Sequence, residues 1–123
     1  IDSNVMGGRA GQFLGNAWSR ITYCPCTASN NFIPSLPCHS VDLIYLCYPN
    51  NPTGTLVERE AIADLARELL PLGTQLVVDE SFLDFREDEA RFTVRQERLE
   101  NLFLVRSLTK FFAIPGLRLG FAA

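Results

Sequence analysis

The chain has 123 residues, of which 47% are hydrophobic and 20% charged, and its formal net charge is −3 at pH 7. This composition is ordinary for a globular protein, and the length is enough for one domain with a moderate core. The small negative charge gives no reason to expect nucleic acid or an anionic membrane as a partner. No apolar run approaches the roughly 20 residues that span a bilayer, and no signal peptide is visible.

Four cysteines raise the question of a zinc site or a disulfide: Cys24, Cys26, Cys38 and Cys47. Cys24 and Cys26 are separated by one residue, whereas structural zinc ligands usually come in wider, repeated pairs. Cys38 has only His39 as a neighbouring ligand type. We therefore expect no metal site, and free thiols in a reducing cytoplasm.

The first 20 residues are rich in Gly, Asn, Ser and Ala, without strong periodicity. They predict a loop with short turns. Ile21–Cys24 is β-branched and aromatic and predicts a short strand, which Pro25 ends.

A strand, a turn and a helix follow in the middle of the chain. Val41–Tyr48 is almost continuously apolar, which is typical of a strand buried on both faces of a parallel sheet. Pro49–Gly54 then predicts a tight turn. Thr55–Glu58 has the spacing of a capping box, so we expect a helix to begin there. Its apolar positions recur at helical spacing, and Pro71 and Gly73 end it.

Three more strands are predicted, over Gln75–Val78, Leu102–Val105 and Leu117–Ala122, and the charged stretch Glu87–Glu100 predicts a solvated loop or an exposed helix. Strands alternating with helical and polar segments indicate an α/β layer structure with a largely parallel sheet. Ligands in such sheets bind at the carboxyl ends of the strands.

Residues that can carry chemistry follow three of these strand ends. Lys110 is the only lysine, and the other ten of the 11 basic residues are arginines. An amine, unlike a guanidinium, can lose its proton and attack a carbonyl carbon. Ser107 and Arg118 flank it, and a hydroxyl and a guanidinium suggest an anionic ligand, plausibly a phosphate. Asp79 follows the strand predicted over Gln75–Val78, and Asn51 lies in the turn after Val41–Tyr48.

Each of these residues also has a structural interpretation. Asp79 could cap a helix or loop, or pair with a cationic ring nitrogen. Glu80 beside it is expected at the surface or behind the site. Asn51 suits a turn by composition alone. Ser107-x-x-Lys110 also matches penicillin-binding enzymes, but the Ser-Asp-Asn and Lys-Thr-Gly elements of those enzymes are missing.

Together, the four clusters resemble the fold-type I, pyridoxal-phosphate-dependent aminotransferases of class I/II. The matching features are Asn-Pro-x-Gly, a strand-end Asp, Ser-x-x-Lys, and an Arg eight residues after the lysine, all in order across residues 41 to 121. The resemblance implies a three-layer α/β fold with a largely parallel sheet. It also implies that residues 1–123 are a single partial domain, the central part of the large domain that binds the cofactor.

The resemblance also implies roles for these residues. Lys110 is similar to the Schiff-base lysine that binds pyridoxal 5′-phosphate and later moves the α-proton. Asp79 is similar to the partner of the pyridine nitrogen, and Asn51 to the donor that bonds the ring's phenolic oxygen. Ser107 and Arg118 resemble phosphate ligands, and Arg106 could be a further neighbour of the phosphate.

The two halves resemble different branches of the family. Residues 1–54 are similar to LL-diaminopimelate aminotransferase. Residues 75–121 are closer to threonine-phosphate decarboxylase, with histidinol-phosphate aminotransferase next. A chimera with a junction near residues 55–75 would explain this, and so would one divergent relative. Many aminotransferases carry a tyrosine three residues after the aspartate, where this chain has Phe82.

The resemblance implies a cytoplasmic transferase that moves an amino group from an amino acid to a 2-oxo acid, in a homodimer. Two alternatives stay open: a decarboxylase of a phosphorylated amino acid, and a non-catalytic fragment or engineered chimera with a vestigial site. The chain begins with Ile1 and lacks the family's glycine-rich phosphate-binding segment and its substrate-carboxylate arginine. We therefore expect a truncated piece that alone binds the cofactor weakly and turns over little substrate.

Overall fold

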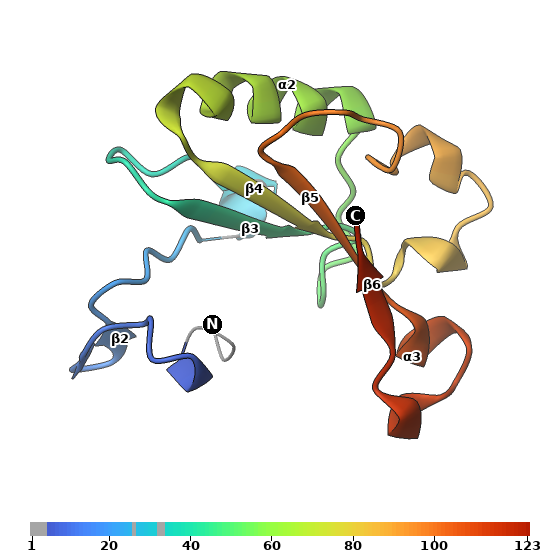
Figure 1. Ribbon diagram of the computed structural model, residues 1–123, viewed down its shortest axis with the longest axis horizontal. Helices are drawn as coiled ribbons and strands as arrows, with labels where there is room; N and C mark the ends of the chain where they lie inside the picture. Colours follow the sequence, from blue (N-terminus) through green and yellow to red (C-terminus); the bar gives the residue numbers. More distant parts are fainter. Residues whose placement is uncertain (1–4, 26, 32–33) are drawn as a thin grey trace. The chain divides into compact units, whose positions relative to one another are not determined.

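The computed structural model describes residues 5–25, 27–31 and 34–123 (Figure 1). The chain divides into two compact units, Ile1–Cys38 and His39–Ala123. The boundary between them falls before the 55–75 stretch. A single partial domain over residues 1–123 stays a prediction.

In the first unit, β1 (Phe13–Leu14) pairs antiparallel with β2 (Ala17–Trp18). Gly15 in the connecting turn has φ 65°, a left-handed conformation that glycine adopts without strain. The strand predicted over Ile21–Cys24 is wrong, because these residues are irregular. Their β-branched and aromatic side chains are a weak signal by themselves, since strand propensity depends on a pairing partner.

The second unit is built on a four-stranded sheet with the order β3-β4-β5-β6 (Figure 1). The first three strands are parallel, and β6 is antiparallel to β5. Their bounds are Leu43–Cys47, Gln75–Asp79, Leu102–Ser107 and Gly120–Ala122. The α-helix α2 (Arg59–Leu69) connects β3 to β4. The predicted α/β fold with a mostly parallel sheet is confirmed.

Helix α2 begins later than the sequence predicts. Its N-cap is Glu58, and Arg59 is its first residue. The Thr55 hydroxyl hydrogen-bonds the Thr53 hydroxyl at 2.9 Å, so it belongs to the turn after β3 and is not free to cap a helix. At the other end, a 3₁₀ turn over Leu70–Leu72 and Gly73, at φ 72°, terminates the helix.

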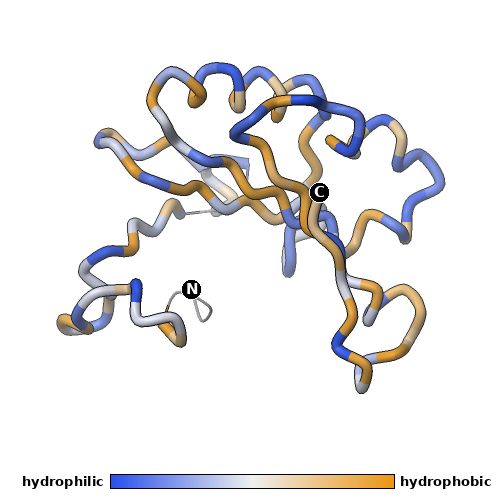
Figure 2. The backbone as a smooth tube through the Cα atoms, in the orientation of Figure 1, coloured by the Kyte–Doolittle hydropathy of each residue, from blue (hydrophilic) through white to orange (hydrophobic). Residues whose placement is uncertain are grey.

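One face of the sheet packs against α2, and this contact is the core. Hydrophobic and hydrophilic residues alternate along α2 (Figure 2), and its apolar side meets alternate residues of the strands. The buried members of this cluster are Tyr48, Ile62, Ala66, Leu69, Leu76, Val78, Val94 and Leu104.

The opposite face of the sheet is open in this chain. Leu43 is 48% exposed, Tyr45 55% and Phe103 43%. The expectation that the strand over Val41–Tyr48 is buried on both faces is therefore wrong here. The continuous apolar run reflects a strand whose second face presents hydrophobic side chains to the surface.

A buried ion pair joins the ends of β4 and β5 on the face that α2 covers. Arg106 is 5% exposed, and its Nη2 donates to Glu80 Oε2 at 2.8 Å. The other oxygen of Glu80 accepts from the backbone N–H of Val94 at 2.8 Å, and Thr93 donates its hydroxyl to Oε2 at the same distance. Glu80 is thus fully enclosed, which corrects the alternative that placed it at the surface.

Two further carboxylates complete this network. Arg106 Nη1 contacts Asp84 Oδ1 at 2.7 Å and Glu89 Oε2 at 3.1 Å. The Arg106 guanidinium therefore forms ion pairs with three carboxylates, all from the segment that follows β4. Because Arg106 and Ser107 are consecutive in a strand, their side chains point to opposite faces. This corrects the expectation that Arg106 neighbours a phosphate bound by Ser107.

Truncating the core under α2 should destabilise the chain. Leu76 is 0% exposed, so we expect Leu76→Ala to lower the free energy of unfolding by about 3 kcal/mol, because it leaves a cavity between β4 and α2. The same change at Leu72, which is 68% exposed, should cost less than about 0.5 kcal/mol. Urea denaturation followed by circular dichroism measures both. Equal losses would contradict this placement of the core.

Removing the buried guanidinium should also be costly. We expect Arg106→Leu to lower the free energy of unfolding by about 3–5 kcal/mol, because it leaves the enclosed Glu80 carboxylate without its cation. The exposed Arg95 offers the matched control, since Arg95→Leu removes a guanidinium from the surface. The same denaturation assay applies, and a loss at Arg106 no larger than that at Arg95 would refute the role of this ion pair.

Candidate functional site

The candidate residues gather at the carboxyl ends of the parallel strands. Asp79 is the last residue of β4, and Ser107 is the last residue of β5. The register pairs Asp79 with Cys47 of β3 on one side and with Val105 of β5 on the other. Ser107 lies two residues beyond Val105, so it shares the open face of the sheet with Asp79.

The Asp79 carboxylate is held by two neutral donors. Its Oδ1 accepts from the backbone N–H of Ser81 at 2.9 Å. Its Oδ2 accepts from the hydroxyl of Tyr45 at 2.5 Å. Partial burial, followed by the hydrogen bond and charge of Asp79, raises the pKa of Tyr45 well above its ordinary value, so the phenol stays protonated at neutral pH.

Tyr45 is a site residue that the sequence did not reveal. Alternation along β3 could have placed it on one face together with Cys47, but only the register between β3 and β4 brings its hydroxyl to Asp79. No feature of the sequence fixes that register. Asp79 does find the partner that its position at the end of an apolar strand requires.

Asn51 lies in the turn after β3. Backbone hydrogen bonds from Asn50 to Thr55 (2.9 Å) and from Gly54 to Asn50 (2.7 Å) close this turn. Burial raises the pKa of the Cys47 thiol, and a backbone hydrogen bond from Asn51 opposes that shift. Because Cys47 is the register partner of Asp79, Asn51 and Asp79 lie at the same end of the sheet.

Ser107 starts the short helix α3 (Leu108–Phe111), which carries Lys110. The Ser107 hydroxyl accepts from the backbone N–H of Thr109 at 3.3 Å and hydrogen-bonds the Thr109 hydroxyl at 2.7 Å. Lys110 is exposed. The only lysine side chain is therefore at the surface, in the short helix that directly follows β5.

Arg118 lies in the same connection between β5 and β6. Ser107 pairs with Gly120, and the Leu108 N–H donates to the Leu119 carbonyl at 3.1 Å, so the connection returns to its starting point. Arg118 is exposed, has φ 52°, and donates to the Pro115 carbonyl at 3.3 Å.

Gly120 permits this close return. A Cβ at Gly120 would lie 2.7 Å from the Arg106 carbonyl oxygen, closer than Cβ atoms are found. β6 can therefore approach the end of β5 only with glycine at this position.

A row of aromatic rings connects the helix that carries Lys110 to the segment after β4. Phe85 lies 5.3 Å from Phe111 between ring centroids, and Phe111 lies 5.2 Å from Phe112. Phe82 stacks on Phe85 at 6.4 Å. Phe82, which stands where many aminotransferases have a tyrosine, thus contributes a packing ring to this cluster and no hydroxyl.

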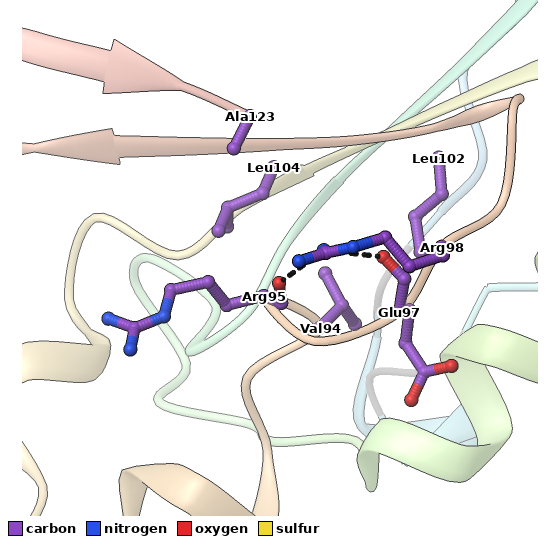
Figure 3. Close-up of a pocket in the computed structure, with 7 residues that line it drawn as sticks. All are labelled: Val94, Arg95, Glu97, Arg98, Leu102, Leu104 and Ala123. Carbon is purple, nitrogen blue, oxygen red and sulfur yellow. Dashed lines mark hydrogen bonds between the residues drawn. The ribbon is translucent and has the colours of Figure 1, made fainter.

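The small pocket in Figure 3 is separate from these residues. It is lined by Val94, Arg95, Glu97, Arg98, Leu102, Leu104 and Ala123. Arg98 Nη1 donates to the carbonyls of Arg95 (3.1 Å) and Glu97 (3.4 Å), so its guanidinium is engaged by the backbone. None of the five candidate residues lines this pocket.

Among the described residues, no group of three or more His, Cys, Asp or Glu side chains could hold a metal ion. Cys26, one of the four cysteines, lies outside the described residues. Within the described ranges, no helix is long and apolar enough to cross a membrane.

Comparison with known proteins identifies relatives of the whole chain. LL-diaminopimelate aminotransferase of Bacteroides fragilis is 36% identical over 126 aligned residues, which cover 98% of this chain and 31% of that protein. The solved structure of L,L-diaminopimelate aminotransferase from Chlamydomonas reinhardtii superimposes with a TM-score of 0.81 at 28% identity, covering 100% of this chain and 31% of that one.

A decarboxylase is also similar. The structure of L-threonine-O-3-phosphate decarboxylase from Porphyromonas gingivalis has a TM-score of 0.57 and 34% identity, covering 67% of this chain and 25% of that one. The chain thus spans less than a third of the length of these relatives. The family model for aminotransferase class I and II matches residues 21–123. The chain belongs to the aminotransferase class I and II family.

Proposed function

We propose that this chain is part of a pyridoxal-phosphate-dependent aminotransferase, which moves an amino group from an amino acid to a 2-oxo acid. The observation that carries the proposal is the placement of the only lysine. Lys110 is exposed one turn beyond the strand end that bears Ser107, beside the strand end that bears Asp79. Family membership supports the same activity.

The residues present fit this cofactor. When bound, pyridoxal phosphate supplies an aldehyde for the amine and a protonated ring that withdraws electrons from the reacting carbon. Asp79 is suited to the ring nitrogen, because the two donors that the described residues give its oxygens are neutral and so do not cancel its charge. Asn51, in the turn after β3, would donate to the phenolic oxygen.

The connection between β5 and β6 is suited to the phosphate and the aldehyde. The Ser107 hydroxyl can donate to a phosphate oxygen, and the exposed Arg118 guanidinium can pair with its charge. Lys110 is the amine that would bond the aldehyde carbon and later carry the α-proton. These roles are assigned to residues at the ends of β4 and β5 or in the segments that follow β3 and β5.

Decarboxylation of a phosphorylated amino acid is the second candidate. Its support is the 34% identity to the threonine-phosphate decarboxylase structure over 67% of the chain. A third candidate is a non-catalytic piece or chimera, since the chain covers less than a third of its relatives. We infer that the complete protein is a cytoplasmic homodimer whose substrates are an amino acid and a 2-oxo acid.

Trapping with borohydride tests the assignment of Lys110. After the purified protein is mixed with pyridoxal phosphate, we expect a visible absorbance band that borohydride abolishes, with the reduced cofactor on the Lys110 peptide in mass spectrometry. Lys110→Arg should lose both signals and keep its far-ultraviolet circular dichroism, because it retains the charge and removes the nucleophile. Since Lys110 is the only lysine, the α-amino group is the only other amine of this kind.

Attachment to the α-amino group alone, or no attachment, would refute the assignment. The reaction class is then decided by the products. With an amino acid and a 2-oxo acid supplied, an aminotransferase forms a new amino acid, whereas a decarboxylase releases carbon dioxide from a phosphorylated substrate.

A further inference from the structure

Tyr45 donates a hydrogen bond to Asp79 although packing alone does not hold its side chain in place. Its side chain is on the open face of the sheet, where it is 55% exposed, so burial does little to hold the ring in place. Its hydroxyl nevertheless donates to Asp79 Oδ2 at 2.5 Å. The position of the hydroxyl is set by this bond more than by packing.

The contact runs diagonally between two strands. The direct register partner of Tyr45 is Val77, and that of Asp79 is Cys47. Tyr45 therefore reaches one pair further along the same face, a span that aromatic side chains can bridge. Leucine, valine or another apolar residue would cover this part of the sheet equally well, but could not donate to Asp79.

We propose that Tyr45 is a positioning residue for Asp79: its hydroxyl fixes the carboxylate so that the acceptor sites left over are directed to a cationic ring nitrogen. This inference rests on the proposed function. It gives a residue of β3 a role in the site, whereas the candidate residue Asn51 lies in the turn after that strand.

The hydrogen-bond capacity of the carboxylate supports this role. An ionised carboxylate offers about four acceptor sites. Ser81 N–H occupies one on Oδ1, and the Tyr45 hydroxyl occupies one on Oδ2. With both oxygens held, the carboxylate cannot rotate freely, and the described part of the chain leaves one acceptor site on each oxygen for a ligand.

The groups around the hydroxyl keep it a donor. Partial burial and the neighbouring Asp79 both raise the pKa of the phenol, and Cys47 on the same strand adds to this. Val77 and Phe103 pair across the sheet in the same row as Tyr45 and carry no charge. Tyr45 therefore donates a proton to the hydrogen bond and does not compete for cations.

Binding of two matched ligands tests the inference. The first is pyridoxal phosphate, and the second is its carbocyclic analogue, which has C–H in place of the ring nitrogen. We expect Tyr45→Phe to weaken binding of pyridoxal phosphate about tenfold, the value of one hydrogen bond to a charged group, and to leave binding of the analogue within about twofold. Tyr23→Phe, the same chemical change in the other unit, should alter neither.

The outcomes separate this inference from the proposed function. If the wild-type protein binds pyridoxal phosphate through Lys110 and Tyr45→Phe binds it equally well, the positioning role fails and the proposed function stands. If Tyr45→Phe weakens both ligands equally, the ring has only a structural role, and the inference fails. If the wild type does not prefer pyridoxal phosphate to the analogue, Asp79 does not recognise the ring nitrogen and the inference fails, whereas the proposed function fails only if no cofactor becomes attached to Lys110.

A second measurement needs no ligand. Absorbance near 295 nm reports ionisation of tyrosine as the pH is raised. In Asp79→Asn the charge that raises the Tyr45 pKa is removed, so Tyr45 should ionise at lower pH than in the wild type. When Tyr45→Phe is introduced into both proteins, the wild type and Asp79→Asn should give the same titration curve. Superimposable titrations of wild type and Asp79→Asn would overturn the contact on which the inference depends.

Discussion

The arrangement of the candidate site depends on the buried ion pair between Arg106 and Glu80. Each of these residues is the chain neighbour of a candidate residue: Glu80 follows Asp79, and Arg106 precedes Ser107. Because side chains alternate along a strand, the ion pair lies on one face of the sheet and the candidate residues on the other. The ion pair on the covered face thus helps to fix the distance between Asp79 and Ser107 on the open face. Losing Arg106 would leave the enclosed Glu80 carboxylate without its cation, which proteins tolerate poorly.

The two faces of the sheet have different roles: one carries the core and the other carries candidate site residues. The face under α2 holds the hydrophobic cluster and the network around Arg106, so it supplies the stability. The open face holds Tyr45, which is exposed, and Asp79 and Ser107, which are half-buried. Apolar side chains such as Phe103 also reach the surface there. A ligand with an aromatic ring and a charged group is compatible with such a mixed surface.

Local patterning located the four strands of the main sheet, although it began the last one at Leu117 instead of Gly120. It also predicted the turn of Asn51 and the strand-end position of Asp79, since these depend on local sequence. It failed where the outcome depends on contacts between distant segments. The capping-box spacing placed the start of α2 too early, because the Thr55 hydroxyl is used by a turn. Arg106 was expected near a phosphate, but three carboxylates from another segment hold it. Tyr45 was not found, because the register that brings it to Asp79 is a property of the assembled sheet.

Asp79 and Glu80 show how neighbouring carboxylates acquire different functions. Glu80 is enclosed and paired with a guanidinium, so its charge is already compensated and inaccessible to a ligand. Asp79 is half-exposed, and the donors that the structure assigns to it, the Tyr45 hydroxyl and the Ser81 N–H, are neutral. Neutral donors fix the orientation of a carboxylate without cancelling its charge. Asp79 therefore retains both a defined geometry and a net negative charge, and these are the two properties that recognition of a cationic ring nitrogen requires.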